Sequence, residues 1–153
     1  KDLDGAIANI AAQVNASSAD DRFYYNLGGP MEVPWRGINA ADPDKRQYVT
    51  VVSHSSWNDD HTGGEMTHKW DDICALGVEC IHISDQNQNL QENDLDTFWS
   101  WSRDHEDENI RWLDSVRMGG DISDAGITYF IVSGLGNQNA SPLDVRDLLN
   151  QGY

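Results

Sequence analysis

The stretch Tyr48-Val-Thr-Val-Val-Ser53 is the clearest strand of this sequence, because β-branched residues fill its centre. Downstream, Thr62-Gly-Gly-Glu65 has the residues of a helical capping box, with Thr62 as the N-cap. Apolar residues then recur at helical spacing as far as Gly77, a residue that suits the end of a helix. Residues 78–84 predict the next strand. The order strand, helix, strand therefore predicts an α/β fold.

The rest of the chain extends this unit. Residues 30–46 hold three of the four Pro and predict a long structured loop. We expect one domain over residues 1–153, an α/β (α+β) two-layer sandwich with helices packed on one mixed or antiparallel sheet. Its further helices are predicted at residues 3–14, within 94–118 and from 142 onward, and its further strands at 22–27 and 127–133.

The charge of the chain excludes one class of partner. Asp and Glu number 26 against 10 Lys and Arg, a formal net charge of −16. Such a field repels phosphate backbones and anionic lipid surfaces, so we expect no nucleic-acid partner. No apolar run approaches the ~18 residues of a membrane-spanning helix. The acidity fits solubility in a salty or acidic medium, or the binding of cations.

Several features predict a secreted glycoprotein. Asn15 and Asn139 both begin glycosylation sequons, and the chain starts without Met, as a mature form does after removal of a leader. Cys74 and Cys80 flank the predicted turn between helix and strand, where they either form a disulfide or remain two buried thiols. The dibasic pair Lys45-Arg46 is either a processing site or two surface charges.

The loop that follows the first strand holds candidate metal ligands. It lies between a strand and a helix, a position where open α/β sheets often carry ligands. Imidazole and carboxylate groups suit zinc, and an open coordination position would activate water. No His-Glu-x-x-His motif is present, so a solvated loop is the alternative. The candidate ligands are His54, Asp59, Asp60, His61 and Glu65.

A second polar stretch, residues 85–96, alternates oxygen-bearing side chains as a calcium-binding loop does. It departs from the EF-hand because Leu90 stands where the turn glycine belongs and Asp96 replaces the bidentate Glu. A polar loop without an ion is therefore the default. We predict no cofactor, with a divalent metal, zinc or calcium, as the alternative.

The six Trp residues divide into two groups, and no catalytic residue can be assigned. A Gly-x-Ser-x-Gly elbow and phosphate-cradling Gly motifs are absent from the sequence. Trp residues outside the apolar stripes could bind a sugar ring or a protein partner. Those expected in the core are Trp70, Trp99 and Trp112, and those expected at a partner surface are Trp35, Trp57 and Trp101.

Four features of the chain form one pattern: the strand Tyr48–Ser53, the Thr/Gly-Gly-Glu helix start, Gly77-Val-Glu-Cys80 leading into the next strand, and a later strand-like run at Gly126–Val132. In this pattern about a third of the chain resembles the small secreted fungal killer toxins. The resemblance implies an α/β-sandwich and a secreted protein that binds a surface target on other cells without enzymatic turnover.

We therefore expect a secreted, acidic binding protein of toxin or effector type that recognises a protein or glycan target. The alternative is a small metal-dependent hydrolase that uses the loop His54–Glu65. A third hypothesis is a calcium-stabilised structural protein. The sequence leaves the target and the oligomeric state open.

Overall fold

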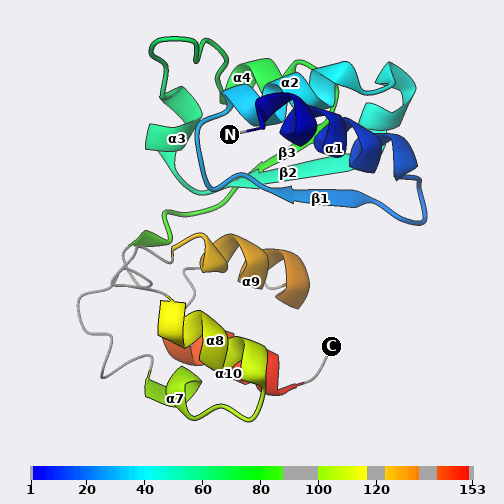
Figure 1. Cartoon of the computed structure of the whole chain (residues 1–153). Coiled ribbons are helices and arrows are strands. Elements are labelled where there is room, and N and C mark those ends of the chain that lie inside the picture. Colours follow the sequence, from blue (N-terminus) through cyan, green and yellow to red (C-terminus); the bar gives the residue numbers. More distant parts are fainter. Residues whose placement is uncertain (1, 88–99, 117–122, 135–140, 152–153) are drawn as a thin grey trace. The chain divides into compact units, whose positions relative to one another are not determined.

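A computed structural model of the chain, shown in Figure 1, describes residues 2–87, 100–116, 123–134 and 141–151. The chain divides into two compact units, Lys1–Ile83 and Ser84–Tyr153. A single domain over the whole chain stays a prediction. None of the helices within the described ranges has the length and apolar character needed to cross a membrane.

The first unit contains a three-stranded parallel sheet in the order β1-β2-β3. The strands are β1 (Phe23–Asn26), β2 (Val49–Ser53) and β3 (Glu79–His82). All three coincide with strands predicted from the sequence. The central strand β2 is buried at every residue, which explains why its sequence is the most uniformly β-branched and apolar of the three.

Helices cover one face of this sheet. Figure 1 shows α1 (Leu3–Ala16), α2 (Glu32–Ala40) and α4 (Trp70–Cys74) lying over it. Because side chains alternate along a strand, Val49 and Val51 of β2 point into the core on that face. The buried core residues there are Val14, Leu27, Met31, Ile38, Ala41, Val49, Val51 and Ile73.

The predicted mixed or antiparallel sheet of a two-layer sandwich is wrong, because every strand pair in the described residues is parallel. Parallel neighbours need a crossover connection, which is usually helical. Between β1 and β2 the crossover contains α2 and the 3-10 helix η1 (Pro43–Tyr48), and between β2 and β3 it contains α3 (Ser56–Asp60) and α4.

Two local predictions in the first unit are also corrected. The expected loop at residues 30–46 contains α2, because Pro34 lies in the first turn of that helix, where its missing N–H costs nothing. The expected helix start at Thr62 is wrong, since α4 begins at Trp70 and Asp72 Oδ2 accepts the N–H of Lys69 at 2.8 Å. The predicted turn at Gly77 is confirmed by its positive φ of 87°.

The second unit is helical in the residues that the structure describes. It contains α7 (Ser100–Arg103), α8 (Glu108–Val116), α9 (Ala125–Ser133) and α10 (Pro142–Asn150). The last helix, predicted from residue 142 onward, is capped by Ser141, whose Oγ accepts the N–H of Asp144 at 3.2 Å. The strand predicted at residues 127–133 is wrong, because this segment lies in α9. Trp112, expected in the core, has 61% of its surface exposed.

Candidate functional site

The carboxyl ends of two neighbouring strands bring Ser53 and His82 side by side. Ser53 is the last residue of β2 and His82 the last residue of β3, and the two are register partners. Because the strands are parallel, both ends lie at the same edge of the sheet, where open α/β sheets bind ligands. Alternation along β2 places Ser53 on the same face as Val51, which is the face covered by helices.

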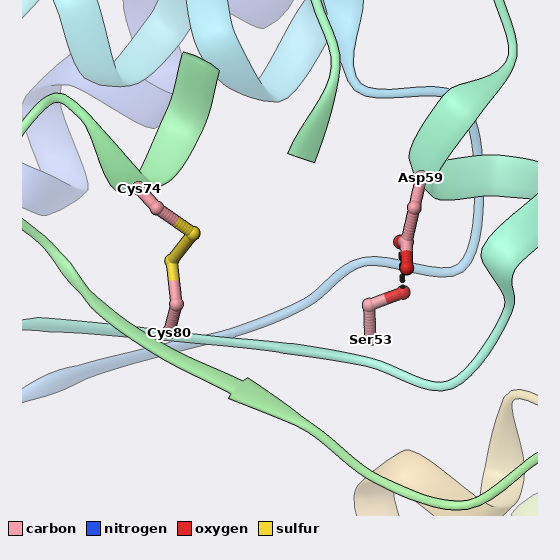
Figure 2. The surroundings of a disulfide bond; sticks show 4 residues. All are labelled: Ser53, Asp59, Cys74 and Cys80. Carbon is pink, nitrogen blue, oxygen red and sulfur yellow. Dashed lines mark hydrogen bonds between the residues drawn. A yellow bond between two sulfur atoms is a disulfide. The ribbon is translucent and has the colours of Figure 1, made fainter. Parts of the chain in front are cut away.

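Asp59 joins these two residues into one cluster. It lies in the short helix α3, which is separated from the end of β2 by two residues. Ser53 Oγ donates to Asp59 Oδ1 at 2.6 Å, as Figure 2 shows. His82 Nε2 lies 2.8 Å from the second oxygen, Asp59 Oδ2. We call Ser53, Asp59 and His82 the strand-end cluster.

Burial differs sharply within the strand-end cluster. Ser53 is 0% exposed and Asp59 7% exposed, whereas 42% of the His82 side chain is exposed. Asp59 is thus a buried carboxylate whose two oxygens are both occupied, and such satisfaction is what a buried charge requires. His82 is the member of the cluster that a ligand can reach.

The order of these groups decides their chemistry. In a Ser-His-Asp triad the histidine lies between the other two, but here the carboxylate is central. Ser53 therefore supports Asp59 and is not activated as a nucleophile. With Nε2 directed at the carboxylate, the neutral His82 ring carries its lone pair on Nδ1. That nitrogen is able to accept a proton from a ligand or from water.

A disulfide at a neighbouring residue of β3 and a ring contact help to hold His82 in place. Cys80, two residues earlier on β3, forms a disulfide with Cys74 of α4, with the Cα atoms 5.9 Å apart (Figure 2). The disulfide, one of the two alternatives for this pair, is thus confirmed. The Trp70 ring meets the His82 ring edge-on, with centroids 6.1 Å apart and planes at 83°. Ring contact, carboxylate and disulfide together restrict the position of the imidazole.

A second buried carboxylate, Glu32, ties α2 to the segment before α4. Its Oε1 accepts from Arg36 Nε at 2.7 Å, and its Oε2 accepts from the backbone N–H of Thr67 at 2.7 Å and of His68 at 3.0 Å. The ring atom His68 Nδ1 lies 2.9 Å from the same Oε2. Trp35 stacks on the His68 ring at a centroid distance of 3.4 Å.

The pKa of Glu32 reflects these contacts. Burial of the side chain raises the pKa, but the hydrogen bonds from Thr67, His68 and Arg36 lower it by more than burial raises it. The pKa therefore falls from 4.5 to about 2. Glu32 is therefore ionised throughout the physiological pH range. All its oxygens serve the fold, which makes it a structural group.

The five predicted metal ligands do not gather around one point. Asp59 belongs to the strand-end cluster, and His54 is buried directly after β2. Asp60 pairs with Lys69 at 3.1 Å, and the His61 ring stacks on Trp57 at 4.0 Å. Glu65 is exposed. No three His, Cys, Asp or Glu side chains come together as a metal site in the described part of the chain, and metal binding stays a prediction.

Sequence reasoning did not include Ser53 and His82 among the candidates. Both were placed correctly as strand residues, so the missing information was the neighbourhood of β2 and β3. A search for polar residues at the carboxyl ends of predicted parallel strands would have found them.

The three predicted partner-binding Trp residues each contact a different histidine. Trp35 lies in α2 against His68, whereas Trp57 lies in α3 and is 62% exposed. Trp101 lies in α7 of the second unit, where its ring meets His105 at 6.0 Å. Among the three, Trp57 offers the aromatic surface that a partner can reach in the first unit. The partner-binding role stays a prediction.

The remaining predicted sites have varied surroundings. Asn15 is exposed, and its Oδ1 accepts the N–H of Asp42 at 2.8 Å. Asn139 and most of the predicted calcium loop lie outside the described residues. The dibasic pair is tied to the fold, because Lys45 Nζ donates to the Ser17 carbonyl at 3.1 Å and Arg46 Nη2 to the Asn39 carbonyl at 2.7 Å.

Comparison with known proteins places this chain beside one curated relative. The sequence is 32% identical over 148 residues to the Uncharacterized protein P22 of Formosa agariphila. The match covers 88% of this chain and 53% of that protein, so the chain spans about half the length of the curated relative it matches. No family model and no solved structure matches the chain. The resemblance to killer toxins stays a prediction.

Proposed function

We propose that the strand-end cluster is the acid–base centre of a hydrolase that acts on a small polar substrate. The observation that supports the proposal is the buried carboxylate of Asp59, which contacts Ser53 on one side and the half-exposed imidazole of His82 on the other. A histidine oriented by a buried carboxylate is a common general base, and the carboxyl edge of a parallel sheet is a common ligand site.

The proposed reaction uses residues of this chain for each proton transfer. His82 Nδ1 takes a proton from a water molecule while the water oxygen bonds to the electrophilic atom of the substrate. Asp59 stabilises the imidazolium that forms, and Ser53 holds Asp59 in place. The imidazolium then returns the proton to the leaving group as its bond to the substrate breaks. The cluster ends the cycle in its starting state.

A secreted location is part of the proposal. The Cys74–Cys80 disulfide supports it, because disulfides persist in oxidising compartments and are rare in the cytosol. The rival function is the non-enzymatic toxin or effector with a protein or glycan target. The exposed Trp57 favours it, since an accessible indole is a frequent anchor in protein and sugar recognition. The hydrolase requires the His82 imidazole for turnover, whereas the binding function does not require it.

The test assays the oxidised chain against chromogenic esters, phosphate esters and glycosides, and repeats the assay on His82→Gln. We expect the substitution to lower kcat/KM by roughly 10²–10⁴-fold, the usual contribution of a general base, with the melting temperature retained. His61→Gln is the matched control, because its ring stacks on Trp57 outside the cluster.

Two results would contradict the hydrolase. One is full activity in His82→Gln. The other is no turnover across the panel in a protein whose binding to cells is abolished by Trp57→Ala. The second result would favour the toxin or effector function.

A further inference from the structure

The first unit contains a pocket that shares no residue with the strand-end cluster. It has a volume of about 260 Å³ and lies between the start of α1, the first turns of α2 and the loop before α4. Its apolar walls include Leu3, Val33 and Met66, and its charged lining consists of Glu32, Arg36 and Glu65. Pockets for drug-sized ligands begin at ~300 Å³, so this one suits a smaller molecule.

The charged lining offers one site for an anion and one for a cation. Arg36 donates to Glu32 through Nε, and its terminal Nη1 and Nη2 have no partner in the described part of the chain. These two donors fit the two oxygens of a carboxylate. The exposed carboxylate of Glu65 likewise pairs with no group among the described residues, so it is available to a ligand ammonium.

The walls of the pocket are held in place before any ligand arrives. A tight turn positions Glu65, because Gly63 and Met66 exchange two backbone hydrogen bonds of 3.0 Å each. The turn needs Gly64 with its positive φ of 59°. The two residues that follow Met66 are anchored by their N–H groups to Glu32. Binding therefore costs little ordering of the protein.

We propose that this pocket binds a free α-amino acid with a large apolar side chain, such as leucine. Its carboxylate would lie against the Nη atoms of Arg36 and its ammonium against Glu65. The side chain would pack on Leu3, Val33 and Met66. A zwitterion matches this lining better than a simple anion, because Glu65 repels a ligand that has only a carboxylate.

Calorimetry with three ligands tests the proposal on the intact oxidised chain. The probes are leucine, leucinamide, which lacks the carboxylate, and 4-methylpentanoate, which lacks the ammonium. We expect saturable binding of leucine and about tenfold or weaker affinity for each analogue, because each loses one charge-assisted interaction. Absence of leucine binding at millimolar concentration, or equal affinity for the three, would overturn the proposal.

Substitutions locate the site. Glu65→Gln should weaken leucine binding about tenfold. It should strengthen the binding of 4-methylpentanoate, because it removes the repulsion between two carboxylates. Val33→Phe should abolish binding by filling the pocket. Asp71→Asn is the matched control, because it removes one exposed carboxylate outside the pocket lining. Equal weakening by Glu65→Gln and Asp71→Asn would show a general effect of charge and would refute the site. Asp59→Asn should bind leucine normally, which separates this proposal from the hydrolase.

Discussion

Glu32 and Asp59 are both nearly buried carboxylates, and each contacts one histidine, yet their surroundings differ. Glu32 accepts two backbone N–H groups and a guanidinium, and its histidine, His68, is covered by Trp35 and 26% exposed. Asp59 has one hydroxyl and one imidazole, and His82 is 42% exposed. Because of its backbone partners, Glu32 stabilises the fold. The accessible imidazole makes Asp59 a candidate for chemistry.

Removing the Glu32 carboxylate should give the largest effect on stability. Glu32→Ala leaves two backbone donors and the Arg36 charge without their acceptor, so we expect a loss of roughly 3–5 kcal/mol in the free energy of unfolding. Urea unfolding followed by tryptophan fluorescence measures it. The control Asp71→Ala, at an exposed position, should change stability by less than ~0.5 kcal/mol. If Glu32→Ala lowered the free energy of unfolding as little as Asp71→Ala does, Glu32 would not have the structural role that distinguishes it from Asp59.

Protonation of Glu32 in acid should remove the same contribution to the free energy of unfolding from the wild-type chain. The folded pKa of Glu32 is about 2, below its ordinary value of 4.5. Its ionisation therefore stabilises the fold fully above pH 4.5, and this contribution, roughly 3 kcal/mol, is lost as the pH falls through 2. Unfolding free energies of wild type and Glu32→Gln, measured from pH 6 to pH 2, should converge at the acid end. Parallel curves would contradict the assignment.

The smallest effect on stability is expected on the Asp59 side. Ser53→Ala removes the buried hydroxyl that donates to Asp59 at 2.6 Å, at a cost of about 2 kcal/mol. Under the hydrolase proposal it should also lower kcat more than it changes KM, because the base is less well oriented. The control is Ser56→Ala, which changes an exposed serine of α3, the helix that contains Asp59. Unchanged turnover in Ser53→Ala would mean that this hydroxyl contributes to packing alone.

The sequence contains two similar β-branched stretches, and only one is a strand. Residues 48–53 supply the central strand β2, which is flanked by neighbours on both sides. Residues 127–133 lie in α9, where the backbone groups bond within the helix. A short apolar run does not reveal its period, so strand and helix were indistinguishable there. Long-range pairing, which the sequence does not encode locally, decides between them.

The candidate site was predictable in part. Asp59 was among the expected ligands because it follows a clear strand, and its location at the carboxyl edge of the sheet agrees with that reasoning. His82 lies 23 residues further along, and its approach to Asp59 depends on the parallel pairing of β2 with β3. Glu32 gave no signal, because it lies in residues 30–46, which were expected to form a loop, and a lone acidic residue is ordinary in a loop.

The covalent link between α4 and β3 has a practical consequence for anyone who prepares this protein. It closes a loop of about seven residues, which in the chain-entropy model is worth about 2 kcal/mol, and it is attached two residues before His82. A thiol reductant in the buffer, or production in a reducing cytosol, releases that attachment. Samples with and without dithiothreitol then differ in how firmly the imidazole is held, and assays on the two are not interchangeable.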